Sequence, residues 1–257
     1  MNWYFYRVWI PLQVLTVAAF VAIALGYLNI NWTLVLISWF LIGPVGTGVG
    51  YHRLFSHRQF ETWKPIEYLI ALLGTLAAYA PVLFWASQHQ YHHKVADTDK
   101  DPSSPTNFGF WESYLWWRMR QSVLKKIDLR NYPTRILIKD PVLVFLSKHF
   151  TKIIYATVIM LAAVDLNLLV SLFVIPVFIE HQRINIVSSA SHLNIPLSYK
   201  NFESEDQGQN NLVLGYTTMG FGWHNNHHAF PRKLINQERW WEIDVEGVIA
   251  WLLKKRF

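Results

Sequence analysis

The chain has 257 residues, of which 52% are hydrophobic, 16% are aromatic and only 16% are charged, and its formal net charge is +6. Soluble domains carry roughly 25% charged residues, so this composition indicates a membrane protein and makes nucleic acid a poor partner for the basic excess. The absence of cysteine excludes disulfides, thiolate metal sites and iron–sulfur clusters.

Five apolar stretches follow one another along the chain. A helix needs about 20 residues to cross the hydrocarbon core of a bilayer. By length alone, each stretch is a candidate membrane span: 10–28, 32–51, 66–85, 141–163 and 166–187.

The positions of the histidines reduce this number. Most of the eleven histidines fall in "HRLFSH" (52–57), "HQYHH" (89–93), "SSASH" (188–192) and "HNNHH" (224–228). If one metal site collects them, an even number of crossings must separate neighbouring groups. Stretch 66–85 lies alone between the first two groups, so we expect an interfacial helix there, disturbed by Pro81. The prediction is a single all-α membrane domain over 1–257, with four transmembrane helices in two hairpins, one interfacial helix and a cytoplasmic helical cap that carries the histidines.

The distribution of lysine and arginine gives the orientation. The loop 29–31 and the turn near Asp165 contain neither residue, whereas the segments on the other side of the predicted spans contain many. This asymmetry places both termini in the cytoplasm of a multi-pass membrane protein. The membrane is the bacterial inner membrane or, if the tail "KKRF" is a retrieval signal, the endoplasmic reticulum. Arg183 lies late in the fourth span, where we expect it to pair with Glu180.

The histidine spacings indicate metal ligation. On a helix, positions i, i+3 and i+4 share a face, so "HQYHH" and "HNNHH" could each direct three imidazoles into one small volume. The separation of five in "HRLFSH" points its histidines apart on an α-helix, which suits two different ions or a distorted helix end. Catalytic zinc usually needs three protein ligands, so eight or nine histidines favour two iron ions. We expect His149 and His181 to be structural.

Two functions other than catalysis would also use histidine in a membrane protein. A haem protein holds its cofactor between histidines inside paired spans, and a metal transporter places ionisable ligands near the middle of the membrane. Here the histidines lie at the ends of apolar stretches or beyond them. The pattern therefore disfavours both alternatives.

The ordered set of motifs resembles the membrane fatty acyl desaturases, above all the group of stearoyl-CoA desaturase and the bacterial acyl-lipid desaturases. "GYHRLFSHRQF" (50–60), "DTDKDP" (97–102) and "GWHNNHHAFP" (222–231) carry the resemblance. It implies two irons bound by nine histidines: His52, His57, His89, His92, His93, His192, His224, His227 and His228. It also implies O2-dependent introduction of a cis double bond into a long saturated acyl chain, with electrons from a separate ferredoxin or cytochrome-b-type haem protein. A fatty acyl or hydrocarbon hydroxylase of the same histidine-box superfamily is the alternative.

The chain departs from that family at several positions. Ser188 stands where the family has an asparagine that holds a water on one iron. Ser87-Gln88 replaces the Arg-Asp pair typical of the acyl-CoA enzymes, which favours a lipid-linked acyl group over a CoA-linked one. Phe221 stands where glutamate is usual. Trp85 matches a tryptophan of the acyl tunnel, and Ile184-Asn185 replaces a pair that shapes its bend, so the resemblance implies no double-bond position.

Three further features have two interpretations each. Asp97, Asp99 and Asp101 either orient ligand imidazoles through their free ring N–H or form a solvated turn. Gly46, Gly48 and Gly50 allow either close helix packing or the passage of an acyl chain. The basic segment Arg118–Lys152 either steers an acidic electron carrier or adheres to anionic membrane lipids.

Overall fold

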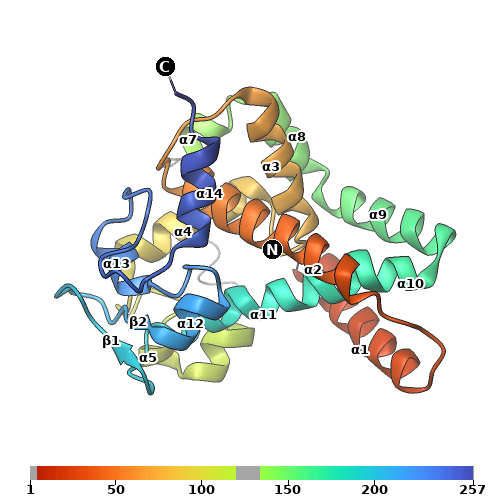
Figure 1. Ribbon diagram of the computed structural model, residues 1–257, viewed down its shortest axis with the longest axis horizontal. Helices are drawn as coiled ribbons and strands as arrows, with labels where there is room; N and C mark the ends of the chain where they lie inside the picture. The colour runs from red at the N-terminus through yellow and green to blue at the C-terminus, as the bar shows by residue number, and fades with distance from the viewer. Residues whose placement is uncertain (1–4, 120–133, 257) are drawn as a thin grey trace.

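The structure is a computed structural model that describes residues 5–119 and 134–256 (Figure 1). These residues are mostly helical. The N-terminal half contains η1 (Phe5–Trp9), α1 (Ile10–Ala24), α2 (Trp32–Phe40), η2 (Leu41–Ser56), α3 (Lys64–Leu76), α4 (Val82–Val95), α5 (Pro105–Phe108), η3 (Glu112–Trp116) and η4 (Trp117–Met119). The C-terminal half contains α7 (Thr134–Leu137), α8 (Pro141–Lys148), α9 (Phe150–Val164), α10 (Leu166–Leu169), η5 (Val170–Val174), α11 (Ile175–Ala190), α12 (Leu212–Thr217), α13 (His224–Ala229) and α14 (Val245–Leu253). Two short antiparallel strands, β1 (Ser198–Tyr199) and β2 (Asn210–Asn211), pair with each other.

Three continuous helices of the described residues are long and apolar enough to cross a membrane: Tyr6–Ala24, Trp32–Ser56 and Leu166–Ala190. A fourth span results if α8 and α9 are counted together, although they are bent by 66°. The predicted span over 141–163 is therefore made of two helices with a sharp bend between them. The chain leaves helical geometry at His149, whose φ is −99° and ψ is 10°.

The ends of the other spans differ from those predicted. The first helix stops at Ala24 rather than near residue 28, the second continues beyond residue 51 to Ser56, and the last continues beyond 187 to Ala190. In Figure 1 the ends of α1, α9 and α10 lie on one side of the molecule, and the histidine-bearing α4 and α13 lie on the other. The second long helix, Trp32–Ser56, therefore has its C-terminal end on the same side as the histidines of α4 and α13.

The stretch 66–85, expected to form one interfacial helix, is instead divided between two helices. α3 ends at Leu76, and α4 begins at Val82 after a break in which Ala78 has a positive φ of 56°. Pro81 precedes α4 and disfavours helical geometry in the residue before it, which explains the break. α3 has 13 residues, so it is about 20 Å long and too short to span a bilayer.

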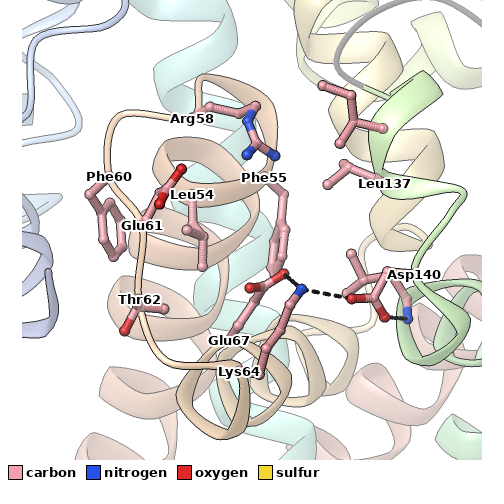
Figure 2. Close-up of a pocket in the computed structure, with 12 residues that line it drawn as sticks. Leu54, Phe55, Arg58, Phe60, Glu61, Thr62, Lys64, Glu67, Leu137 and Asp140 are labelled. Atoms are coloured by element: carbon pink, nitrogen blue, oxygen red, sulfur yellow. Dashed lines mark hydrogen bonds and ion pairs between the residues drawn. The ribbon is translucent and has the colours of Figure 1, made fainter. Parts of the chain in front are cut away.

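α3 is attached to α8 by an ion-pair cluster at the start of both helices. The Lys64 ammonium lies 3.1 Å from Glu67 and 2.8 Å from Asp140, as Figure 2 shows. Asp140 also caps α8 by accepting hydrogen bonds from the backbone N–H groups of Val142 and Leu143. The cluster lines a pocket of about 280 Å³ between α3, α7, α8 and the end of η2.

Close contacts with backbone or side-chain atoms explain the glycines that precede His52. A Cβ on Gly46 would lie 2.5 Å from the backbone nitrogen of Gly74 in α3, and one on Gly50 would lie 2.4 Å from Ile70. A Cβ on Gly48 would lie 2.0 Å from the carboxylate of Glu246. Of the two interpretations, these distances favour helix packing over the passage of an acyl chain.

A buried charge network joins α11, η2 and α14. Arg183 bonds Glu180 at 2.8 Å, which confirms the expected pair, and it also bonds Glu246 at 2.6 Å. Arg53 bonds both carboxylate oxygens of Asp244, at 2.8 and 2.9 Å. All five side chains are buried. The network therefore fixes the C-terminal helix against two helices that are long and apolar enough to cross a membrane.

Replacing Arg183 with Met is expected to lower the free energy of unfolding by about 3–5 kcal/mol, because two buried carboxylates would lose their cation. Replacing Lys64 with Ala is the matched control, since the Lys64 side chain is 60% exposed and its pairs should contribute about 1 kcal/mol or less. Thermal unfolding of the detergent-solubilised protein measures both effects. An equal loss in the two variants would contradict the importance of the buried network.

Candidate metal centre

The nine predicted histidines gather in two adjoining clusters. In each of the groups His52, His57, His89, His227 and His92, His192, His224, His228, the candidate ligand atoms lie within 4.8 Å of one another. The Nε2 atom of His93 lies 3.1 Å from that of His89 and 3.0 Å from that of His227, so His93 adjoins the first group. We call these sets the five-histidine cluster and the four-histidine cluster.

Each of the two H-x-x-H-H motifs divides its rings between the clusters. On α4, His89 and His93 belong to the five-histidine cluster and His92 to the four-histidine cluster. On α13 the division is reversed, because His224 and His228 belong to the four-histidine cluster and His227 to the other. The expectation that each motif directs three rings into one volume is therefore wrong.

A π-helix resolves the separation of five between His52 and His57. In η2 the hydrogen bonds join residue i to residue i+5, and the N–H of His57 donates to the carbonyl of His52 at 3.1 Å. On an α-helix two such residues point about 140° apart, but the wider π-helical turn brings them to nearly the same side. Their ring centroids lie 4.9 Å apart in the same cluster. Of the two alternatives, the structure shows the distorted helix end, with both rings in one cluster.

The distances between ring nitrogens fit a metal ion with more than four ligands. Within the five-histidine cluster, Nε2 atoms are separated by 2.8 Å (His57 to His89), 2.9 Å (His52 to His227) and 3.0 Å (His93 to His227). Nitrogens bound about 2.1 Å from one ion lie about 3.0 Å apart at right angles and about 3.4 Å apart in a tetrahedron. In the four-histidine cluster, Nε2 of His228 is buried without a hydrogen-bond partner. The residues present therefore fit two metal ions.

Carboxylates contact the four-histidine cluster from outside. The bonded pairs are His192 Nδ1 with Asp97 at 2.7 Å, His92 Nδ1 with Asp101 at 3.0 Å, and His228 Nδ1 with Asp206 at 3.0 Å. The orienting interpretation thus holds for Asp97 and Asp101, whereas Asp99 is exposed and has no such bond. Sequence reasoning missed Asp206, whose only signal was its place in the acidic run "ESED".

Burial also favours the neutral form of His57 and His228. Removal from water lowers the pKa of His57 to about 3 and that of His228 to about 4. For Asp206, burial alone would raise the pKa, but the hydrogen bond from His228 lowers it below its usual range. Near pH 7 the rings of His57 and His228 are therefore unprotonated and the Asp206 carboxylate is ionised, as metal ligation by imidazole requires.

Two asparagines hold the third motif in place. The Asn226 amide donates to the carbonyl of Asn236 at 2.8 Å and to Glu242 at 2.9 Å. The Asn225 side-chain oxygen accepts from the backbone N–H groups of Asn201 and Phe202, at 2.8 and 2.9 Å. Sequence reasoning did not single out this pair, although it forms the centre of "HNNHH". The asparagines orient α13 so that its histidines can meet those of α4.

One small apolar pocket reaches both clusters. It has a volume of about 40 Å³, and its lining includes His89, His92 and His224 together with Trp85, Ile184, Ser188, Tyr79, Trp117 and Phe221. Asn185 is absent from the lining: its side-chain oxygen accepts from the Tyr79 hydroxyl at 2.9 Å and from Arg118 at 2.7 Å. The Ser188 hydroxyl donates to the carbonyl of Asn185 at 3.1 Å.

The basic segment Arg118–Lys152 is only partly described, because residues 120–133 lie outside the described residues. Arg118 itself does not belong to a basic surface. Its side chain is buried and its guanidinium lies 3.9 Å from the centroid of the Tyr79 ring. Ser87 is likewise buried and bonds Thr134, whereas Gln88 lines the pocket.

His149 and His181 belong to neither cluster. His181 is fully buried, and its Nε2 atom lies 3.0 Å from the carbonyl oxygen of Ala77. Its Nδ1 atom lies 3.4 Å from the amide nitrogen of Gln13. The ring of His149 packs against Phe145, with centroids 4.5 Å apart. These contacts agree with structural roles for both residues.

Comparison with known proteins identifies the family. The sequence profile of the fatty acid desaturase family matches residues 30–242. The chain is 33% identical over 231 residues to an sn-1 stearoyl-lipid 9-desaturase of Anabaena variabilis, covering 88% of this chain and 82% of that one. It is 35% identical over 217 residues to an sn-2 palmitoyl-lipid 9-desaturase of a Nostoc species, covering 82% and 74%, respectively. It is 29% identical over 224 residues to a probable acyl-CoA desaturase of Schizosaccharomyces pombe, covering 84% and 46%. The chain therefore belongs to the fatty acid desaturase family and is an oxidoreductase that acts as a fatty acyl desaturase.

Proposed function

We propose that this desaturase introduces a cis double bond into a long saturated acyl chain of a membrane lipid, using O2 and two electrons at two irons held by the nine histidines. The observation that carries the proposal is the convergence of both histidine clusters on one apolar pocket. The number and spacing of the nitrogens in the five-histidine cluster favour iron over a four-coordinate zinc site.

The substrate explains the need for a metal. Methylene groups of a saturated chain are unreactive, and bound iron with O2 would supply the oxidising power that no side chain has. The protein contributes the positioning of the chain and the exclusion of water. Trp85, Phe221 and Ile184 give the pocket an apolar wall next to His89 and His224. Ser188 is in the same wall, where its hydroxyl could hold a water beside the four-histidine cluster.

A lipid-linked acyl group agrees best with the surroundings of the pocket. Ser87 is buried against Thr134 and cannot contact a CoA phosphate, and Gln88 is uncharged. The cyanobacterial relatives are named as stearoyl-lipid and palmitoyl-lipid 9-desaturases, which supports a lipid substrate and a double bond at carbon 9.

A separate carrier would supply the electrons, since this sequence contains no cysteine that could hold an iron–sulfur cluster. A ferredoxin or a cytochrome-b-type haem protein would fill this role. The carrier would approach from the cytoplasm, where a helical cap built from α4, α13 and their connecting loops carries the histidines. Four spans in two hairpins would leave both termini on the same side, in the bacterial inner membrane or the endoplasmic reticulum.

The metal content tests the di-iron centre. Purified active protein is expected to contain two irons per chain, and His227→Ala should reduce this to about one, because it removes a ligand of the five-histidine cluster. His149→Ala is the control and should keep both ions. Elemental analysis of the three proteins measures the ratio. One ion in wild-type active enzyme, or full occupancy in His227→Ala, would contradict the assignment.

The products distinguish desaturation from hydroxylation. The protein would be produced in a host that lacks such activity and supplied with a fully deuterated stearoyl chain. Mass spectrometry is expected to detect loss of two deuterons without a gain of oxygen, and the double bond should lie at carbon 9. A hydroxy acid as the main product, from protein of normal metal content, would favour the hydroxylase instead. Separate assays with lipid-linked and CoA-linked chains identify the carrier.

Labelling of single cysteines tests the topology, since the natural chain has none. Tyr27→Cys lies in the loop between α1 and α2, where the Tyr27 side chain is 78% exposed, and should react with a membrane-impermeant reagent from outside the cell. Lys100→Cys follows α4 and should react only after the membrane is permeabilised. Labelling of Lys100→Cys in intact cells would overturn the orientation.

A further inference from the structure

The two histidine clusters differ in what surrounds them. Three of the four rings in the four-histidine cluster donate from Nδ1 to a carboxylate, namely to Asp97, Asp101 or Asp206. Among the described residues, no ring of the five-histidine cluster is bonded to a carboxylate. The contrast cannot follow from the motifs, because α4 and α13 each contribute to both clusters.

Each carboxylate is held by donors on both of its oxygens. Besides His228, Asp206 accepts from the N–H of Gly208 at 2.8 Å and from the hydroxyl of Ser204 at 3.2 Å. Asp97 accepts from the N–H of Gln207 at 2.8 Å.

Asp101 has the same kind of environment. It accepts from the N–H and the hydroxyl of Ser103, at 3.0 and 2.8 Å, in addition to His92. Since every neighbour is a donor, the ring nitrogen that faces each carboxylate must carry the proton. In the neutral ring, this tautomer leaves the Nε2 lone pair of His92, His192 and His228 available to a metal ion.

The five-histidine cluster has no comparable acceptors. The Nδ1 atoms of His52 and His227 are buried without a hydrogen-bond partner. The neighbour of His57 Nδ1 is the amide nitrogen of Gln90 at 3.3 Å, and that amide already donates to the carbonyl of Ser56. Nothing in these contacts determines which nitrogen of the three rings is protonated.

We infer that Asp97, Asp101 and Asp206 are positioning residues that make the two metal sites inequivalent, so that the four-histidine cluster binds its ion first and releases it last. The inference rests on the proposed di-iron function and goes beyond it. Three ionised carboxylates hold their rings in the ligating tautomer before the metal arrives, and their negative charge offsets the charge of the ion. Removal of one such partner typically weakens metal binding by about 10- to 100-fold.

Asparagine is a sharp probe of this role. In Asp206→Asn, an amide facing His228 Nδ1 would donate rather than accept and so favour the wrong tautomer. Turning the amide round would place its NH2 group against the N–H of Gly208 and the hydroxyl of Ser204. Asp99→Asn is the matched control, because it removes the same charge from an exposed residue of the neighbouring acidic turn.

The experiment measures release of Fe²⁺ to a chelator under anaerobic conditions, using the full-length protein in detergent. Wild type and Asp99→Asn are expected to release their two ions in a fast and a slow phase of equal amplitude. Asp206→Asn should accelerate the slow phase by about 10- to 100-fold. Repeating the measurement in a His227→Ala background, which keeps only the four-histidine site intact, assigns the slow phase to that site.

Mössbauer spectra of ⁵⁷Fe-loaded protein provide the readout that a merely structural role would not change. Wild type should show two iron environments, and Asp206→Asn should alter only one of them while the melting temperature of the metal-free protein stays unchanged. Identical spectra and release rates in Asp206→Asn and Asp99→Asn would overturn the inference. A wild-type protein that never binds two ions would instead overturn the proposed di-iron function.

Discussion

The nine imidazole rings are the constraint on which the rest of the structure depends. Nε2 atoms of seven of these rings face one another at 2.8–3.1 Å in a buried volume, where neutral rings cannot all be hydrogen-bonded and charged rings would repel. Such crowding is favourable only when metal ions bind the lone pairs of the ring nitrogens and the surrounding protein fixes each histidine-bearing segment in place. Buried bonds do this beside each motif: Arg53 next to His52 holds Asp244, and Asn226 next to His227 holds Glu242.

The π-helix η2 adapts a membrane-spanning helix to this constraint. It runs for 16 residues, from Leu41 to Ser56, and includes Pro44, which has no N–H to donate. π-Helices are rare, usually single turns, and frequent at functional sites. Here the wider turn brings His52 and His57 together, while the glycines of the same segment let α3 pack against its backbone. One local distortion therefore serves both ligation and packing.

Features that depend on residues close together in the sequence could be predicted. Contacts between residues far apart in the sequence could not. The clustering of histidines in short motifs, the Glu180–Arg183 pair and the approximate number of apolar helices followed from local spacing, whereas the full set of nine histidines, with the lone His192, was implied by the family resemblance. The break between α3 and α4 was underestimated, because the length of the apolar stretch outweighed the signal of Pro81. Asp206 contacts a histidine 22 residues away, and Glu246 contacts an arginine 63 residues away. No local pattern indicates which loop returns to a given site.

The positions of two buried cations explain how the pocket stays apolar in a protein that needs charges for rigidity. The Arg183 guanidinium lies 5.1 Å from the centroid of Phe221, and the Arg118 guanidinium lies 3.9 Å from that of Tyr79. Both rings line the pocket, whereas neither arginine does. Phe221 also packs against the ring of His52, with centroids 4.9 Å apart. Each aromatic ring thus separates a cation from the space beside the histidines, and the cation in turn stabilises the ring. The same buried charges that fix the helices can therefore hold the ligands rigid without wetting the pocket.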